Sequence, residues 1–194
     1  MKADIILAGV GGQGILSIAA ALGAAALNEN LYLKQAETHG MSQRGGAVIS
    51  HLRISDKPIW SDLIPIGKAD LILSVEPMES LRYLEYLAPA GSVVTNTSEV
   101  RNIPDYPDLG NEFQKLAKKI NLIRIDADGI AHEIGNPRAS NMVMLGAASL
   151  FIQIDEEVIK KGIESIFKPK GEKIVSLNKK AFDAGKKCAA MRKE

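Results

Sequence analysis

The first fourteen residues constrain the fold of this chain more than any other segment. An apolar run from Asp4 to Gly9 leads directly into a glycine-rich turn, Gly9 to Gly14, and into a helical pattern that spans Gly12 to Asn28. Continuous apolar positions are typical of a strand buried on both faces. The glycines have the G-x-G-x-x-G spacing, which brings the free N–H groups of a helix N-terminus close to an anion or a docked partner. The sequence therefore predicts a Rossmann-like first βα unit.

The rest of the chain alternates between strand-like and helix-like patterns. We expect strands at 32–35, 47–54, 70–75, 92–96 and 122–126, and helices at 78–87, 112–118 and 128–133. Beyond Pro137 the pattern is helical, at 141–151, 155–161 and 174–191. Such alternation predicts a three-layer α/β fold with a mostly parallel sheet, helices on both faces and a helical C-terminal segment. At 194 residues, the chain 1–194 is expected to form one domain.

Composition excludes several classes of function. The formal net charge is +1, and Lys and Arg are dispersed, so nucleic acid is not an expected partner. Cys188 is the only cysteine and cannot build an iron–sulfur or zinc site, so we expect no metal on this chain and assign any such cofactor to another chain. The run from Ile15 to Leu27 is about half the length needed to cross a bilayer. We therefore expect a cytoplasmic protein with no membrane contact.

The glycine turn fits an anion better than it fits a dinucleotide. A dinucleotide site also needs an acid at the end of the second strand to hold the ribose. Here that strand is expected to end at Lys34-Gln35, and the nearest acid, Glu37, lies 23 residues past Gly14 in a polar loop. Tight strand-to-helix packing alone would also explain the glycines. The candidate ligand or interface residues of the turn are Gly9, Gly11, Gly12, Gln13 and Gly14.

A second polar motif spans 37–46, Glu-Thr-His-Gly-Met-Ser-Gln-Arg-Gly-Gly, and is expected to be a loop. Arg44 before two glycines can present a guanidinium beside exposed N–H groups, a seat for a carboxylate or phosphate, although a structural salt bridge is the alternative. Glu37 and His39 could share a proton or a ligand, or His39 could be an ordinary loop histidine. No catalytic residue is assigned. The candidates are Glu37, Thr38, His39, Gly40, Ser42, Gln43, Arg44, Gly45 and Gly46.

Two further residues are singled out with less weight. Glu76 follows the strand 70–75, where the carboxyl edge of a sheet faces a ligand crevice, and is a second-tier site candidate. Trp60, the only tryptophan, lies between Pro58 and Pro65 and is either a core or an interface residue.

The two polar motifs together resemble a known family. G-x-G-G-Q-G after the first strand and E-T-H-G-M-S-Q-R-G-G after the second are similar to the beta, or small, subunit of indolepyruvate ferredoxin oxidoreductase. They also look like the gamma subunit or domain of 2-oxoacid (pyruvate/ketoisovalerate) ferredoxin oxidoreductases. The resemblance runs along the whole chain and includes 141–147 and 177–182. It makes Asn141 a second-tier site candidate.

The resemblance implies oxidative decarboxylation of an aryl or other 2-oxoacid to an acyl-coenzyme A, with electrons passed to ferredoxin. In the family, thiamine diphosphate, magnesium and iron–sulfur clusters lie on a large thiamine-dependent partner subunit, and ferredoxin is reached through the complex. Coenzyme A is the one cofactor that this chain could itself contact. Two other hypotheses remain open from the residues: a free-standing nucleotide- or coenzyme A-binding α/β protein, and a purely structural assembly partner.

Overall fold

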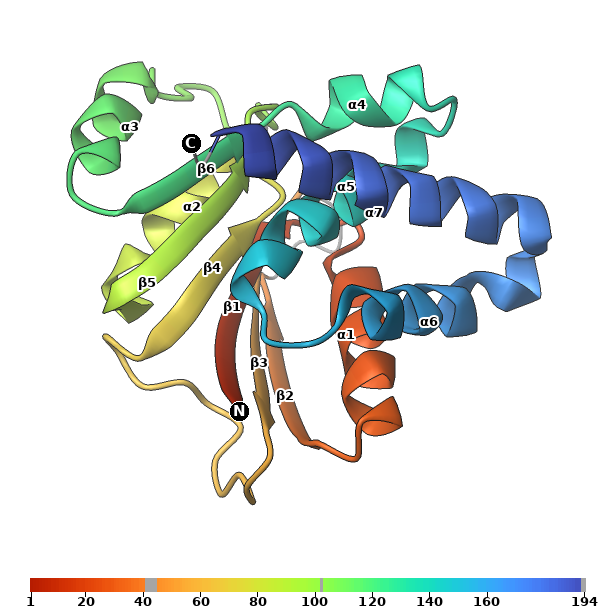
Figure 1. Ribbon diagram of the computed structural model, residues 1–194. Helices are drawn as coiled ribbons and strands as arrows, with labels where there is room; N and C mark the ends of the chain where they lie inside the picture. The colour runs from red at the N-terminus through yellow and green to blue at the C-terminus, as the bar shows by residue number, and fades with distance from the viewer. Residues whose placement is uncertain (41–44, 102, 193–194) are drawn as a thin grey trace.

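A computed structural model describes residues 1–40, 45–101 and 103–192 of the chain. Its centre is a sheet with the strand order β2-β3-β1-β4-β5-β6 (Figure 1). The strands are β1 (Lys2–Val10), β2 (Tyr32–His39), β3 (Ala47–Ser55), β4 (Ala69–Ser74), β5 (Leu87–Asn96) and β6 (Asn121–Ile125). The pairs β1/β4, β4/β5 and β5/β6 are parallel, whereas β3 runs antiparallel to both β1 and β2. The prediction of a mostly parallel sheet is confirmed, with β3 as its exception.

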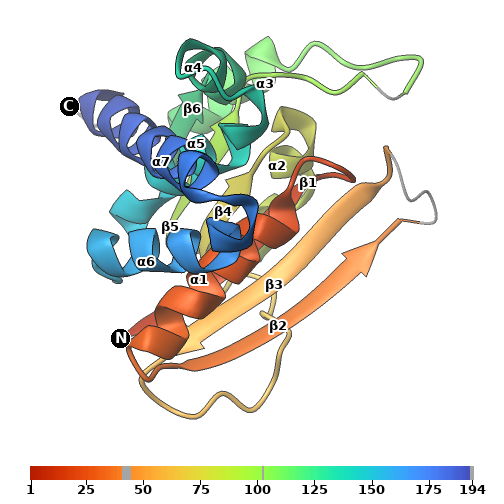
Figure 2. The ribbon, with the colours of Figure 1, turned by 90° about the vertical axis from the view of Figure 1, so that its right-hand side faces the viewer.

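The reversed strand β3 decides which loops meet. Gly9 pairs with Val48 and Val10 with Ala47 at the end of β1, and on the other side His39 of β2 pairs with the same Val48. Strands β2 and β3 therefore form a hairpin, and the end of β2 and the start of β3 lie at the same end of the sheet as the glycine turn (Figure 2). The described parts of the second polar motif lie beside the first for this reason.

Helices cover both faces of the sheet, as expected. One face carries α1 (Ile15–Asn28), α5 (Ser140–Ala148), α6 (Glu156–Phe167) and α7 (Glu172–Arg192) (Figure 1). On the other face, α2 (Pro77–Arg82) and the 3-10 turn η1 (Leu84–Tyr86) cover a smaller core formed by Ile6, Ile72 and Val93. The remaining helices are α3 (Gly110–Ala117), which packs beside β6, and α4 (Ala127–Glu133), which packs on α5. Short 3-10 turns follow at η2 (Pro137–Ala139), η3 (Ser149–Phe151) and η4 (Lys168–Lys170).

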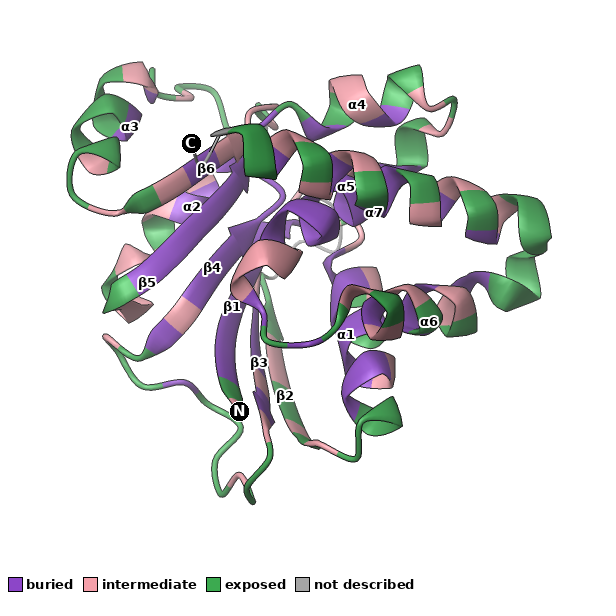
Figure 3. Cartoon of the chain, viewed as in Figure 1, coloured by how far each residue is buried: buried purple, intermediate pink, exposed green. Residues whose placement is uncertain are grey.

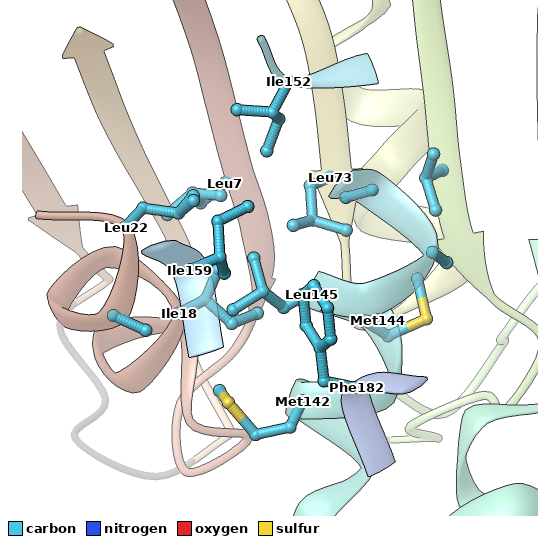
Figure 4. Packing of buried hydrophobic residues seen from close by; sticks show 14 of the residues in the cluster. Leu7, Ile18, Leu22, Leu73, Met142, Met144, Leu145, Ile152, Ile159 and Phe182 are labelled. Atoms are coloured by element: carbon cyan, nitrogen blue, oxygen red, sulfur yellow. The ribbon is translucent and has the colours of Figure 1, made fainter. Parts of the chain in front are cut away.

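The main core lies between the sheet and the C-terminal helices. Leu7 and Leu73 of the sheet meet Ile18 of α1, Leu145 of α5 and Phe182 of α7, all at most 1% exposed (Figure 4). The central strands are buried along most of their length, and the outer helix faces are exposed (Figure 3).

Helices α5 and α7 cross in direct backbone contact. A Cβ atom on Gly146 would overlap the carbonyl oxygen of Phe182, and one on Gly185 would overlap that of Val143. The two glycines therefore let the helix axes approach more closely than side chains would allow.

Several predicted boundaries are wrong. Strand β2 continues to His39 rather than Gln35, because every residue from Tyr32 to His39 pairs with β3. The helix expected from Gly12 begins at Ile15, since Gly14 has a left-handed φ of 79°. Helix α6 runs to Phe167 rather than 161.

Candidate functional site

The glycines of the turn are required for different structural reasons. Gly12 and Gly14 have φ values of 101° and 79°, in the left-handed region that favours glycine. A Cβ on Gly14 would lie 2.5 Å from Nδ2 of Asn141, and one on Gly9 would overlap the side chain of Val75. A Cβ on Gly12, in contrast, would meet nothing within 4 Å. The space next to Gly12 is therefore not filled by other residues of the chain.

Two side-chain amides hold this turn in place. Gln13 accepts a hydrogen bond at Oε1 from Val10 N (2.8 Å) and donates through Nε2 to the carbonyl of Val75 (3.2 Å). Asn141 donates through Nδ2 to the carbonyl of Gly14 (3.1 Å). Gln13 thus ties the turn to the end of β4, and Asn141 ties it to α5. The second-tier candidate Asn141 consequently lies at the turn, although it is far away in the sequence.

The hairpin connection lies against the turn. Gly11 N donates to the carbonyl of Gly46 (2.9 Å), and Gly40 N donates to that of Ala47 (2.9 Å). Residues 37–39, predicted to begin a loop, are instead the end of β2, because they pair with β3. The carboxylate of Glu37 is mostly buried, and its Oε1 contacts Nε2 of the exposed His39 imidazole. The candidates Ser42, Gln43 and Arg44, together with Met41, lie outside the described residues.

A cavity of about 470 Å³ opens on the other side of the turn, towards the C-terminal helices. Two cationic side chains, Arg138 of η2 and Lys170 of η4, lie at its wall with the N-terminal residues of α1. Cations beside a helix N-terminus are the features that bind phosphate or carboxylate groups. The polar residues that line the cavity are Gln13, Ser17, Asn136, Arg138, Ser140, Asn141, Lys170 and Asn178.

A second cavity of about 260 Å³ lies between the turn and the hairpin. Its walls are mostly apolar, with Glu37 and His39 as its ionisable groups. Gly12 and Gly14 line both cavities. A long ligand could therefore cross the turn at Gly12, with an anionic end on the cationic side and a less polar end beside Glu37 and His39.

Glu76 is fully buried at the end of β4 and lines neither cavity. Its Oε2 accepts from Glu79 N (2.8 Å) and caps α2, while its Oε1 accepts from Tyr106 Oη (2.6 Å) and Val100 N (3.3 Å). Burial raises the pKa of the Tyr106 hydroxyl, and the hydrogen bond to Glu76 raises it further. Glu76 thus fastens the segment around 100–106 to the carboxyl edge of the sheet.

We expect Tyr106→Phe to lower the free energy of unfolding by about 1.5 kcal/mol, because it removes a donor from a buried carboxylate. Tyr32→Phe is the control: Tyr32 is 50% exposed on the edge strand, and the change should stay within about 0.5 kcal/mol. Urea denaturation monitored by circular dichroism measures both. Equal midpoints for the two variants would contradict the role given to the Tyr106 hydroxyl.

Asn96 was not predicted from the sequence. It links Val75, which also holds the glycine turn through Gln13, to the start of α4. Asn96 Nδ2 donates to the carbonyl of Val75 (3.3 Å) and to Asp128 Oδ2 (3.0 Å), and its Oδ1 accepts from Ala127 N (3.0 Å). Gln13 and Asn96 therefore share one carbonyl acceptor. The available signal was positional, since Asn96 ends a strand at the same edge as Glu76. Arg138 and Lys170 were also missed, because only the packing of the C-terminal helices brings η2 and η4 to the same cavity.

The described residues provide neither a metal-binding cluster nor a membrane-spanning helix. Among residues 1–40, 45–101 and 103–192, no cluster of three or more His, Cys, Asp or Glu side chains could hold a metal ion. With Cys188 as the only cysteine, the chain cannot supply the several thiolate ligands of an iron–sulfur cluster. None of the helices in the described part of the chain is long and apolar enough to cross a membrane.

Comparison with known proteins places the chain in a family. The pyruvate ferredoxin/flavodoxin oxidoreductase family matches residues 4–188. Indolepyruvate oxidoreductase subunit IorB of Pyrococcus horikoshii is 38% identical over 96% of this chain and 95% of its own length. Among solved structures, the keto/oxoacid ferredoxin oxidoreductase gamma subunit of Geobacter sulfurreducens has a TM-score of 0.74 at 24% identity, over 97% of this chain and 99% of its own. The 2-oxoglutarate:ferredoxin oxidoreductase of Magnetococcus marinus, with 2-oxoglutarate, coenzyme A and succinyl-CoA bound, has a TM-score of 0.79 at 24% identity, over 98% of this chain but 31% of its own. The chain belongs to the pyruvate ferredoxin/flavodoxin oxidoreductase family.

Proposed function

We propose that this chain is the small subunit of an indolepyruvate-type 2-oxoacid:ferredoxin oxidoreductase. The observation that carries the proposal is the 38% identity to an indolepyruvate oxidoreductase subunit over nearly the full length of both chains. In the proposed reaction an arylpyruvate loses carbon dioxide, its remaining acyl group is joined to the thiol of coenzyme A, and the electrons released pass to ferredoxin. The whole chain 1–194 acts as one domain of a cytoplasmic complex.

The redox cofactors belong to the partner in this proposal. This chain offers one cysteine, whereas an iron–sulfur cluster needs several thiolate ligands. We therefore assign thiamine diphosphate, magnesium and the iron–sulfur clusters to a large subunit, through which ferredoxin is also reached. The small subunit then contributes binding and positioning rather than electron transfer.

Coenzyme A is the ligand that best suits the two cavities around Gly12. Its phosphate groups would find Arg138, Lys170 and the N-terminus of α1 in the larger cavity. Its less polar pantetheine arm would then cross Gly12 towards Glu37 and His39 in the smaller cavity. The solved Magnetococcus enzyme, 31% of whose chain shares this fold, has coenzyme A bound, which supports this choice of ligand.

Co-expression with the large subunit tests the proposed function. Arylpyruvate-dependent reduction of ferredoxin should require both chains, and activity of the large subunit alone at the full rate would refute the proposal. Titration calorimetry of the isolated chain with coenzyme A and adenine nucleotides tests the free-standing alternative, which requires heat of binding without the partner.

Arg138→Ala with Lys170→Ala should raise the KM for coenzyme A in the assembled enzyme by roughly tenfold or more, because a hydrogen bond to a charged group contributes about 1.5 kcal/mol or more. Lys180→Ala is the matched control, since Lys180 is exposed on α7 and lines neither cavity. If the chain is instead a purely structural partner, the unchanged enzyme, the double variant and the Lys180→Ala control should all have the same KM for coenzyme A. Steady-state rates at varied coenzyme A distinguish these results.

A further inference from the structure

The segment between β3 and β4, residues 56–68, carries large apolar side chains that are not buried in the core of this chain. Trp60 is 92% exposed, Leu63 55% and Ile66 64%. The segment lies at the opposite end of the sheet from the glycine turn, below β1 and β4 in Figure 1, and Figure 3 shows it exposed along most of its length. We call residues 56–68 the tryptophan loop. The sequence left open whether Trp60 is a core or an interface residue, and its exposure excludes the core.

The tryptophan loop is held in shape by buried polar groups. Arg53 Nη1 donates to the carbonyls of Ser61 and Leu63, each at 3.1 Å. The Arg53 guanidinium is itself fixed by two hydrogen bonds to Asp4, which is 2% exposed. Because the loop is already ordered, burying its exposed indole against a partner costs little conformational entropy.

A second anchor lies at the middle of the loop. The Ile64 side chain is 2% exposed and packs into the smaller core with Ile6 and Ile72, while its N–H donates to Nδ1 of buried His51 (3.2 Å). Ile64 therefore points into the core, whereas Leu63 and Ile66 on either side of it are exposed. The fold fixes which apolar residues of the loop remain at the surface.

The charges of the loop select the class of partner. Asp56 and Asp62 balance Lys57 and Lys68, so the loop offers no net field for nucleic acid or an anionic membrane. A fixed apolar surface centred on tryptophan, on a loop with no net charge, is typical of a permanent protein interface.

We infer that the tryptophan loop is one of the surfaces through which this chain docks on the large subunit of the oxidoreductase, an inference that rests on the proposed function. The fold of this chain makes up 31% of a longer chain in the Magnetococcus enzyme, where the remaining domains are joined to it covalently. A separate small subunit needs a non-covalent contact of comparable permanence. Trp60 and Leu63 line neither cavity, so their substitution tests assembly without altering the proposed coenzyme A site.

Substitution of the exposed side chains tests the inference. Trp60→Ala and Leu63→Ser should each leave the unfolding midpoint of the isolated chain unchanged. They should raise the Kd for the large subunit, roughly thirtyfold for Trp60→Ala, as for an interface hot spot. Leu27→Ser is the matched control, because Leu27 is 66% exposed on α1, and its Kd should equal that of the unchanged chain. Sedimentation velocity of the mixed subunits measures all of these values.

The single tryptophan provides an independent readout. With 5-fluorotryptophan incorporated into this chain alone, one ¹⁹F resonance should shift and broaden when the unlabelled large subunit is added. Unchanged affinity for Trp60→Ala and Leu63→Ser, or an unchanged resonance in a formed complex, would overturn the docking inference while leaving the proposed function intact. Loss of self-association of the isolated chain in these variants, with unchanged large-subunit affinity, would assign the loop to a second copy instead. Failure of the unchanged chain to bind the large subunit would refute the proposed function itself.

Discussion

Gly146→Ala is expected to lower the free energy of unfolding by about 2 kcal/mol, and Gly146→Val by about 3 kcal/mol or more. The added methyl would overlap the carbonyl of Phe182, so α5 and α7 would have to separate. Alanine recovers about 1 kcal/mol of helix propensity over glycine, which makes its net effect the smaller one. Urea denaturation at one protein concentration gives both values.

Gly110→Ala is the control for this pair. Gly110 is the first residue of α3, and an added Cβ would approach only the Asp108 carboxylate, at 3.2 Å. That side chain can move, so we expect a change within about 0.5 kcal/mol or a small gain in stability. Gly185→Ala should reproduce the loss seen at Gly146, because its Cβ would overlap Val143 from the other helix. Equal stability of all four proteins would show that α5 and α7 do not touch through their backbones.

Gly14→Ala is expected to cost about 2–3 kcal/mol of stability. A left-handed φ costs an alanine about 1–2 kcal/mol, and the new Cβ would also displace the Asn141 amide that bonds to the Gly14 carbonyl. Gly12→Ala has the same kind of φ but open space around its Cβ, so it should cost only the conformational part.

A double-mutant cycle separates the two terms at Gly14. In the Asn141→Ala background the clash with the amide is gone, and Gly14→Ala should then cost about as much as Gly12→Ala. Additive losses in the cycle would mean that the turn and α5 are not coupled through Asn141. Thermal or urea unfolding of the four proteins of the cycle gives the coupling energy.

The parts of the fold that follow from local pattern were predictable. The strand from Asp4 and the turn ending at Gly14 could be read directly, because burial on both faces requires a continuous apolar run and the turn requires glycine. The direction of β3 could not be read, since the pattern of a strand is the same whichever way it runs. The extension of β2 through Glu37 and His39 also depends on pairing with β3, which overrides their polar character.

The candidate site divides in the same way. The glycine turn and Asn141 carried a signal in the sequence, and the structure brings them into contact. Arg138 and Lys170 carried none, because each is an ordinary basic residue until helix packing places it beside the turn. The hairpin places Glu37 and Gly46 at the turn only because β3 reverses direction.

The central position of β1 has a consequence for how the chain is made. This strand is synthesised before both of its neighbours in the sheet, β3 and β4, which end only at Ser55 and Ser74. During translation, the apolar stretch from Ile5 to Val10 therefore stays without a sheet partner until residue 55 has emerged, and without its second partner until residue 74 has emerged. The β2–β3 hairpin is local and can close as soon as residue 55 is free, which gives β1 its first partner well before β4 is available. The reversal of β3 thus shortens the time for which this apolar stretch of the nascent chain is exposed without a sheet partner.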